Sequence, residues 1–252
     1  MNLYDHIGQI HTETLPPQGM TSIVTLVTSE KGQFALKQSD CAPYVDWLKR
    51  EAHVLQALAQ TNLPVPRFIA LDEQPAATSL LMTALPGEPL SQYLCRGLSK
   101  ARRLDLLEQF GRTLAAIHHT PPPLRLQVDQ PWLARILAEA RHNLQQGYVE
   151  PGAPPIDDFA AAAPPTTPEV LIHGDYTIDN VLVDDNRITG IIDWGRGDMG
   201  DRRYDLVLAT RPQGPEAVFL EEVDFTAFYT GYAGERMTES EYKWFYGLYE
   251  YF

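Results

Sequence analysis

The stretch that decides the fold runs from Val170 to Trp194 and reads VLIHGDYTIDNVLVDDNRITGIIDW. Three short apolar runs in it predict strands, and a turn over residues 184–186 separates the second run from the third. Polar residues stand where these runs begin or end: Asp175, Asn180 and Asp193. Loops at the ends of rigid elements are where proteins commonly place catalytic groups, so this stretch is the candidate site.

The chemistry of these three side chains points to phosphoryl transfer. Two carboxylates and one amide carbonyl are hard oxygen ligands, which suit Mg²⁺ with substrate phosphates in its shell. Asn180 and Asp193 can hold the metal, which leaves Asp175 able to accept a proton from an attacking hydroxyl.

The bulk composition narrows the class of protein. The chain has 252 residues, enough for one large domain or two small ones. A net charge of −13 argues against nucleic-acid binding and suits a cationic small substrate, or it aids solubility. The cysteines Cys41 and Cys95 have no metal or redox spacing, and the chain shows neither a signal peptide nor an apolar run of membrane-spanning length. We therefore expect a cytoplasmic protein that does not contact membranes.

The first 85 residues predict a small β-rich lobe. A hairpin is expected over residues 23–38, a helix over 43–60, and two further strands over 68–71 and 79–84. The loop over residues 15–22 is of a kind that can lay backbone N–H groups over a phosphate, although most such loops are plain turns. Glu51 falls on the flank of the helix's apolar stripe and needs a cationic partner, which Lys37 can supply; the alternative is two solvated charges.

The break at Leu85-Pro86-Gly87-Glu88-Pro89 predicts a boundary, with residues 1–85 as one lobe and 86–252 as a larger, mainly helical lobe. Helices are expected over residues 100–119, over 131–146 and within 221–252, with residues 147–168 as a loop. His118 lies on the apolar face of its helix and is expected to be a hydrogen-bonded core residue. Residues 195–200 match G-x-G-x-x-G, but we expect no βαβ unit here and reject dinucleotide binding.

The order Lys37, Glu51, Asp175, Asn180, Asp193 resembles the protein-kinase-like fold. The sequences of the motifs are similar to those of the aminoglycoside phosphotransferase and choline kinase family, in which H-G-D-x-x-x-x-N is the catalytic loop; I-I-D-W surrounds Asp193. Residues 81–87, 114–118 and 200–206 also resemble that family's segments. The resemblance implies an α+β fold with two lobes, a small β-rich N-lobe and a larger helical C-lobe.

The resemblance also implies roles for individual residues. Asp175 is the expected base, Asn180 and Asp193 the expected Mg²⁺ ligands, and Asp205 an anchor for the backbone of the catalytic loop, with His173 structural. The expected nucleotide-binding residues are Lys37, Glu51, Gly19, Ser22, Met82, Thr83 and Leu85. The chain's ending resembles that of kanamycin-type enzymes, so the candidate substrate contacts are Glu250, Phe252 through its terminal carboxylate, and Asp198.

The expected activity is transfer of the γ-phosphate of ATP or GTP, with Mg²⁺, to a hydroxyl of an aminoglycoside-like or other amine-bearing small molecule. A metabolic kinase for choline, a sugar or a similar metabolite is the first alternative. A catalytically inactive nucleotide-binding regulatory module is the second, which the presence of all five motif residues disfavours. The motifs leave open the acceptor, the choice between ATP and GTP, and the oligomeric state.

Overall fold

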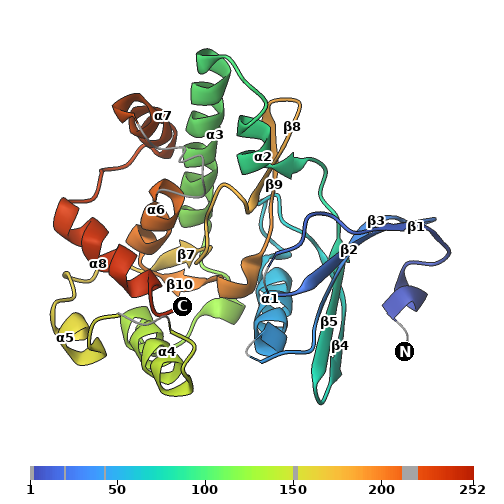
Figure 1. Cartoon of the computed structure of the whole chain (residues 1–252), viewed down its shortest axis with the longest axis horizontal. Helices are drawn as coiled ribbons and strands as arrows, with labels where there is room; N and C mark the ends of the chain where they lie inside the picture. The colour runs from blue at the N-terminus through green and yellow to red at the C-terminus, as the bar shows by residue number, and fades with distance from the viewer. Residues whose placement is uncertain (1–2, 20, 43, 150–152, 212–220) are drawn as a thin grey trace. The chain divides into compact units, whose positions relative to one another are not determined.

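The computed structural model describes residues 3–19, 21–42, 44–149, 153–211 and 221–252 (Figure 1). The chain divides into two compact units: residues 1–96 with 179–197, and residues 97–178 with 198–252. Residues 179–197, which include Asn180 and Asp193, thus belong to the first unit, whereas Asp175 belongs to the second. These units differ in extent from the division at residue 85 predicted from sequence.

The first unit is built on a five-stranded antiparallel sheet in the order β1-β2-β3-β5-β4. The strands are β1 Ile10–Thr14, β2 Ile23–Ser29, β3 Gly32–Ser39, β4 Phe68–Gln74 and β5 Ala77–Thr83. The hairpin expected over residues 23–38 is confirmed by β2 and β3, and each of the other two predicted strands extends toward the turn that joins β4 to β5. A small core around Val27, Leu36 and Leu81 packs under this sheet.

Helix α1, Tyr44–Leu58, confirms the predicted helix, whose expected first residue, Pro43, lies outside the described residues. It packs against β3, β4, β5 and the short 3-10 helix Trp194–Arg196. A second, three-stranded sheet in the same unit has the order β6-β8-β9, formed by Glu88–Pro89, Val181–Asp184 and Arg187–Ile191, with α2, Leu90–Leu94, beside β6 and β8.

The second unit is mainly helical. It contains α3 Lys100–His118, α4 Trp132–Gln146, α5 Ile156–Ala161, α6 Arg202–Thr210, α7 Glu222–Tyr232 and α8 Glu239–Tyr249. Its two short strands, β7 Val170–Ile172 and β10 Asp198–Gly200, pair antiparallel. An aromatic-rich core joins α4, α6 and α8, and contains Trp132, Tyr204, Trp244 and Phe245.

Helices α3 and α7 lie side by side (Figure 1), and glycine makes their close approach possible. A Cβ atom on Gly111 would lie 2.0 Å from the carbonyl oxygen of Phe228, and one on Gly231 would lie 1.8 Å from that of Glu108. Any side chain larger than hydrogen would push the two backbones apart.

One expectation from the sequence was wrong, and one element was not predicted. Residues 147–168 do not form only a loop, because α5 starts at Ile156 with two acidic residues in its first turn. The G-x-G-x-x-G segment contains a strand, β10, which the sequence did not predict. In the described part of the chain, α7 and α8 follow α6, and residues 212–220 between α6 and α7 lie outside the described residues.

Candidate active site

Lys37 is the centre of a buried ion cluster in the first unit. Its ammonium nitrogen lies 3.0 and 2.9 Å from the two carboxylate oxygens of Glu51, and 3.0 Å from Oδ1 of Asp193. Lys37 comes from β3 and Glu51 from the middle of α1, where Glu51 is 1% exposed. The pairing of Lys37 with Glu51 predicted from sequence is confirmed, and the alternative of two solvated charges is wrong.

Charge keeps this lysine protonated in spite of its burial. Burial lowers the pKa of Lys37, but the adjacent carboxylates of Asp193 and Glu51 outweigh it and hold the pKa above its ordinary value. Burial also raises the pKa of Glu51, and the charge of Lys37 acts in the opposite direction. Lys37 therefore stays cationic, and its ammonium group donates to the carboxylates of Glu51 and Asp193.

Asn180 and Asp193 lie at the same end of the β8–β9 hairpin. Asn180 directly precedes β8, Asp193 follows β9 by two residues, and the hairpin register pairs Val181 with Ile191. The N–H of Ile192 donates to the carbonyl oxygen of Asn180 at 2.9 Å, which extends the pairing by one step. The two side chains that the sequence assigned to a metal are thus brought to one place by strand pairing.

The backbone of Asp193 adopts a left-handed conformation, with φ 65° and ψ 58°. A residue with a side chain is uncommon there, and such conformations concentrate at functional sites. The following 3-10 helix holds it in place, because Gly195 packs against the carbonyl oxygen of Trp47 and Arg196 lies over the Trp47 ring. The side chain of Asp193 remains 46% exposed, so its carboxylate is accessible to a ligand.

The donor set of Asn180 and Asp193 fits Mg²⁺. Both side chains offer hard oxygen atoms, and Mg²⁺ typically takes one or two protein carboxylates and completes its shell with water and phosphate oxygens. Within the described residues, no group of three or more His, Cys, Asp or Glu side chains is arranged to hold a metal ion.

In the second unit, the segment that carries Asp175 is fixed by Asp205. The two carboxylate oxygens of Asp205, which is fully buried, accept hydrogen bonds from the backbone N–H groups of His173 and Gly174, both at 2.7 Å. The N–H of Asp175 lies 3.2 Å from Nδ1 of His173. The expected roles of Asp205 as an anchor and of His173 as a brace are confirmed by these contacts.

His118 supports the same carboxylate from α3. Its Nε2 lies 3.2 Å from Asp205 Oδ2, and its Nδ1 lies 2.9 Å from the hydroxyl of Tyr232 on α7. The predicted structural role of His118 is confirmed. The chain of contacts from Tyr232 through His118 to Asp205 ties the catalytic loop to the α3–α7 pair.

The nucleotide-loop residues predicted from sequence, Gly19 and Ser22, lie just before β2. No described atom lies within 4 Å of a Cβ placed on Gly19, so the backbone there is open to a ligand. Sequence reasoning missed Gln18, whose side-chain oxygen accepts from the N–H of Val24 at 2.7 Å and whose amide donates to the Val24 carbonyl at 3.0 Å. Gln18 thereby holds this loop against the first residues of β2; a glutamine has no distinguishing sequence signal.

Met82, Thr83 and Leu85 lie at the end of β5 and just after it. The N–H of Thr83 donates to the Arg67 carbonyl at 3.0 Å. Met82 is buried in the sheet, and the side chain of Leu85 packs at Gly190.

The three candidate substrate residues lie in the second unit. Asp198 is already engaged, because its carboxylate pairs with Arg135 and accepts from the N–H of Met199. Glu250 is exposed at the end of α8. The chain end near Phe252 is held in place, because the Tyr251 carbonyl accepts from Asn143 at 2.9 Å and the Tyr251 hydroxyl donates to the Pro154 carbonyl at 2.6 Å.

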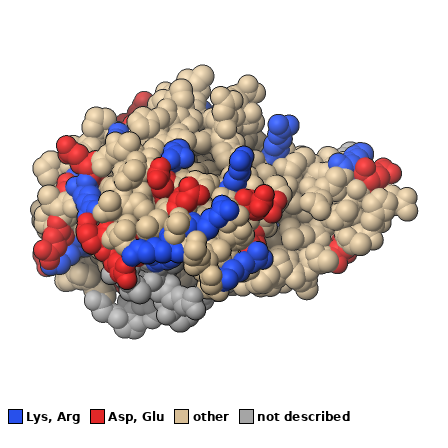
Figure 2. Space-filling view, turned by 90° about the horizontal axis from the view of Figure 1, so that it is seen from above, with Lys and Arg blue, Asp and Glu red and all other residues tan. Residues whose placement is uncertain are grey.

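Charge on the surface is mixed where Figure 2 shows it, with acidic and basic side chains interspersed. Several charged side chains form exposed ion pairs, such as Lys243 with Glu239, and such pairs contribute little to stability. In the part of the chain that the structure describes, no helix is both long enough and apolar enough to cross a bilayer.

The antiparallel sheet followed by helices, with a Lys–Glu pair and a loop of sequence H-G-D-x-x-x-x-N, defines a protein-kinase-like fold. A model of the phosphotransferase enzyme family matches residues 13–237, and the chain belongs to this family. A crystal structure of an aminoglycoside-3'-phosphotransferase of type VIII superimposes with a TM-score of 0.78 at 21% identity, covering 100% of both chains. An aminoglycoside phosphotransferase in a ternary complex with ADP and hygromycin B gives 0.69 at 18% identity, covering 98% of this chain and 86% of that one.

Two relatives differ in the substrate that their names state. An aminoglycoside 3'-phosphotransferase of Streptomyces ribosidificus is 32% identical over 177 residues, which are 65% of this chain and 65% of the relative. The match thus spans just under two thirds of that relative's length. A homoserine kinase of Neisseria meningitidis serogroup B is 27% identical over 241 residues, 90% of this chain and 74% of the relative.

Proposed function

We propose that this protein is a nucleotide-dependent phosphotransferase that moves the γ-phosphate of ATP or GTP to a hydroxyl of an aminoglycoside. The observation that carries the proposal is the buried Lys37, held between Glu51 and Asp193. A permanent cation braced by two carboxylates, one of them an accessible oxygen ligand, has little structural purpose unless a phosphate and its metal bind there.

Different side chains of the protein have different roles in the proposed reaction. Lys37 binds the nucleotide phosphates, and Glu51 fixes its position. Asn180 and Asp193 would hold Mg²⁺, which when bound neutralises charge on the transferring phosphate. Asp175 accepts the proton of the acceptor hydroxyl while that oxygen bonds to the γ-phosphorus and the bond to the β–γ bridging oxygen breaks, so a nucleoside diphosphate leaves.

The rigidity of the catalytic loop supports Asp175 as the base. A base must stay within hydrogen-bond reach of its proton, and a displacement of about 1 Å can cost roughly a hundredfold in rate. The two backbone hydrogen bonds to Asp205 prevent such a displacement. Asp175 itself is partly exposed, as a group that meets a substrate must be.

An aminoglycoside is the favoured acceptor because several relatives are named aminoglycoside 3'-phosphotransferases, among them one with 32% identity. The net charge of −13 and the exposed Glu250 suit a polycation. A metabolic kinase is the second candidate, favoured by one observation: the homoserine kinase match extends over 90% of the chain.

Turnover measurements distinguish these readings. Purified protein with Mg²⁺ and either ATP or GTP is offered kanamycin, an analogue of kanamycin without the 3'-hydroxyl, homoserine, or choline. We expect release of nucleoside diphosphate with kanamycin and none with the deoxy analogue. Turnover with homoserine or choline alone would establish the metabolic reading, and tight nucleotide binding without turnover on any acceptor would establish the regulatory one.

The assignment of the base has its own matched pair of variants. Asp175→Asn should lower kcat by roughly a hundredfold or more, since general-base catalysis contributes about that much. Asp179→Asn lies in the same loop, is exposed and accepts a hydrogen bond from Ser91 that an amide can keep, so it should retain activity. Unchanged turnover in Asp175→Asn would reject Asp175 as the base.

A further inference from the structure

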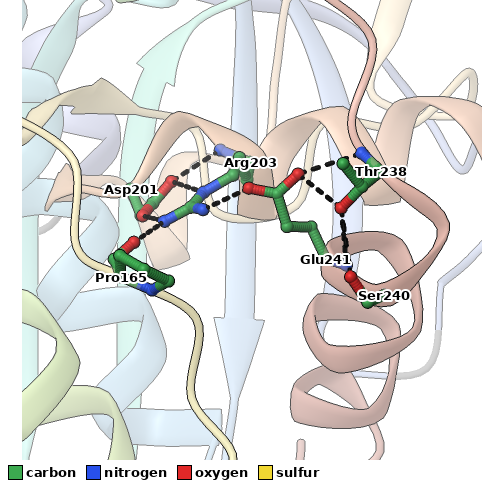
Figure 3. Close-up of polar contacts among 6 residues, drawn as sticks. All are labelled: Pro165, Asp201, Arg203, Thr238, Ser240 and Glu241. Carbon is green, nitrogen blue, oxygen red and sulfur yellow. Dashed lines mark hydrogen bonds and ion pairs between the residues drawn. The ribbon is translucent and has the colours of Figure 1, made fainter.

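Arg203, near the start of α6, is only 7% exposed and lies among acceptors from separate segments of the second unit. Its Nε and one terminal nitrogen donate to the two carboxylate oxygens of Asp201 at 3.0 and 2.6 Å. The same terminal nitrogen donates to the Pro165 carbonyl at 2.7 Å, and the other terminal nitrogen donates to Glu241 at 2.7 Å. Figure 3 shows the guanidinium between these acceptors.

The contacts with Asp201 and Pro165 fix Arg203 beside the start of β7. Asp201 is the N-cap of α6, where it also accepts the backbone N–H of Arg203 at 3.0 Å. It directly follows Gly200, which pairs with Val170, the first residue of β7. The Pro165 carbonyl belongs to the segment that leads into β7. Arg203 therefore holds the start of β7 both from the paired strand and from the preceding chain.

The other end of β7 is held by the same helix. Asp205 lies two residues after Arg203 in α6, and it accepts the N–H groups of His173 and Gly174, which directly follow β7. A two-stranded ribbon with strands of three residues is not stable by itself, so its position depends on such flanking contacts. The position of Asp175, the next residue of the loop, depends on them in turn.

Helix α8 fixes the orientation of the guanidinium from the opposite side. Oε1 of Glu241 accepts from Arg203, while Oε2 accepts from the N–H and the hydroxyl of Thr238 at 2.9 and 2.8 Å. The Thr238 hydroxyl lies 3.2 Å from that of Ser240 (Figure 3). The guanidinium carbon lies 4.9 Å from the centre of the Phe245 ring. A planar cation with acceptors at its edges and a ring over its face is restricted to one orientation.

From these contacts we infer that Arg203 is a positioning residue for the catalytic base. Arg203 fixes the start of β7 and Asp205 fixes its end, so the strand and the loop that carries Asp175 keep one position. The inference rests on the proposed phosphotransfer and adds to it a residue on which the reaction depends, although that residue does not touch the reacting atoms.

Hydrogen exchange of the full-length protein tests the inference without any substrate. In Arg203→Lys the charge remains, but all donors come from one nitrogen, which cannot reach Asp201, Pro165 and Glu241 together. Peptides that cover residues 170–175 should exchange at least fivefold faster by mass spectrometry, and peptides from α1 in the first unit should be unchanged. Arg112→Lys, in an exposed pair with Glu108, is the matched control and should leave exchange unchanged.

Steady-state kinetics with kanamycin and Mg-ATP test the consequence for catalysis. A displacement of the base by about 1 Å can cost roughly a hundredfold, and Asp205 still holds the loop in Arg203→Lys, so kcat should fall about tenfold. The KM for ATP should change little, because Lys37 and Glu51 lie in the first unit. A loss confined to kcat distinguishes a displaced base from a general loss of folded protein.

Two further variants separate the contacts of Arg203. Glu241→Gln still accepts from the guanidinium and still completes the capping box of α8, so exchange over residues 170–175 and kcat should stay within about twofold. Asp201→Asn keeps the N-cap of α6 but weakens the link to Arg203, so it should change both measurements about threefold. It replaces Arg203→Lys if circular dichroism shows that variant to be unfolded.

Unchanged exchange over residues 170–175 in Arg203→Lys and Asp201→Asn would overturn the inference, as would faster exchange there with a normal kcat. A loss of kcat in Glu241→Gln as large as in Arg203→Lys would assign the effect to α8 instead of β7 and would also overturn it. Absence of turnover by the native protein would count against the proposed function, and the exchange of residues 170–175 would still decide whether Arg203 fixes the loop.

Discussion

Replacing Asp205 by asparagine tests the link between the buried core of the second unit and the catalytic loop. The native carboxylate is acceptor-only and receives the N–H groups of His173 and Gly174, one on each oxygen, with His118 beside it. An amide keeps one oxygen and turns an N–H₂ donor toward the other backbone donor. One charge-assisted hydrogen bond is weakened and the other becomes a buried donor–donor contact.

The magnitude follows from these two contacts. A hydrogen bond to a charged group contributes about 1.5–3 kcal/mol, and leaving a buried donor unsatisfied costs about 1–3 kcal/mol more. Asp205 is fully buried, so solvent cannot compensate. We therefore expect Asp205→Asn to lower the free energy of unfolding by about 2.5–6 kcal/mol.

Urea denaturation followed by circular dichroism measures this loss, and Asp184→Asn, at an exposed site on β8, is the matched control with an expected change within about 0.5 kcal/mol. At a temperature where the variant is folded, kcat should fall by roughly a hundredfold, because Asp175 is displaced, while the KM for nucleotide changes little. A loss below about 1 kcal/mol together with normal kcat would refute the reasoning that Asp205 holds the loop.

Three further changes test other parts of the structure. Glu51→Gln removes one of the two carboxylate charges that face Lys37, so the KM for nucleotide should rise about tenfold in steady-state assays. An unchanged KM would show that the Lys37–Glu51 pair does not contribute to nucleotide binding. Gly231→Ala brings a methyl group into collision with the Glu108 carbonyl oxygen and should lower the free energy of unfolding by about 1–3 kcal/mol in urea titrations. An unchanged free energy of unfolding would show that α3 and α7 can accept a side chain at this position. Burial raises the pKa of Tyr232 to about 12; the unfolded chain ionises near its ordinary value of 10.0, so stability should fall as pH rises between the two. In Tyr232→Phe, the denaturation midpoint should fall less steeply with pH over this range. The same pH dependence in the variant and the native protein would contradict this prediction.

Most of the helices and strands could be predicted from local patterns of apolar residues in the sequence. The β2–β3 hairpin, α1, α3 and α4 were all predictable because each shows an apolar period of two or of about 3.6 between clear turn residues. The helix over residues 156–161 and the strand over residues 198–200 were not predicted, because elements of six and three residues are too short to show a period. Their formation depends on partners: β10 exists because it pairs with β7.

The sequence by itself determined which candidate groups are present and in what order: H-G-D-x-x-x-x-N and I-I-D-W fix the order and type of Asp175, Asn180 and Asp193, because spacing along a chain is written in the residues. Only the tertiary structure decided which charges are buried and what each one touches. It gave Lys37 its two carboxylates, Asp205 its two backbone donors and Thr167 no partner, because contacts between separate elements depend on how those elements pack, and no local pattern encodes that packing.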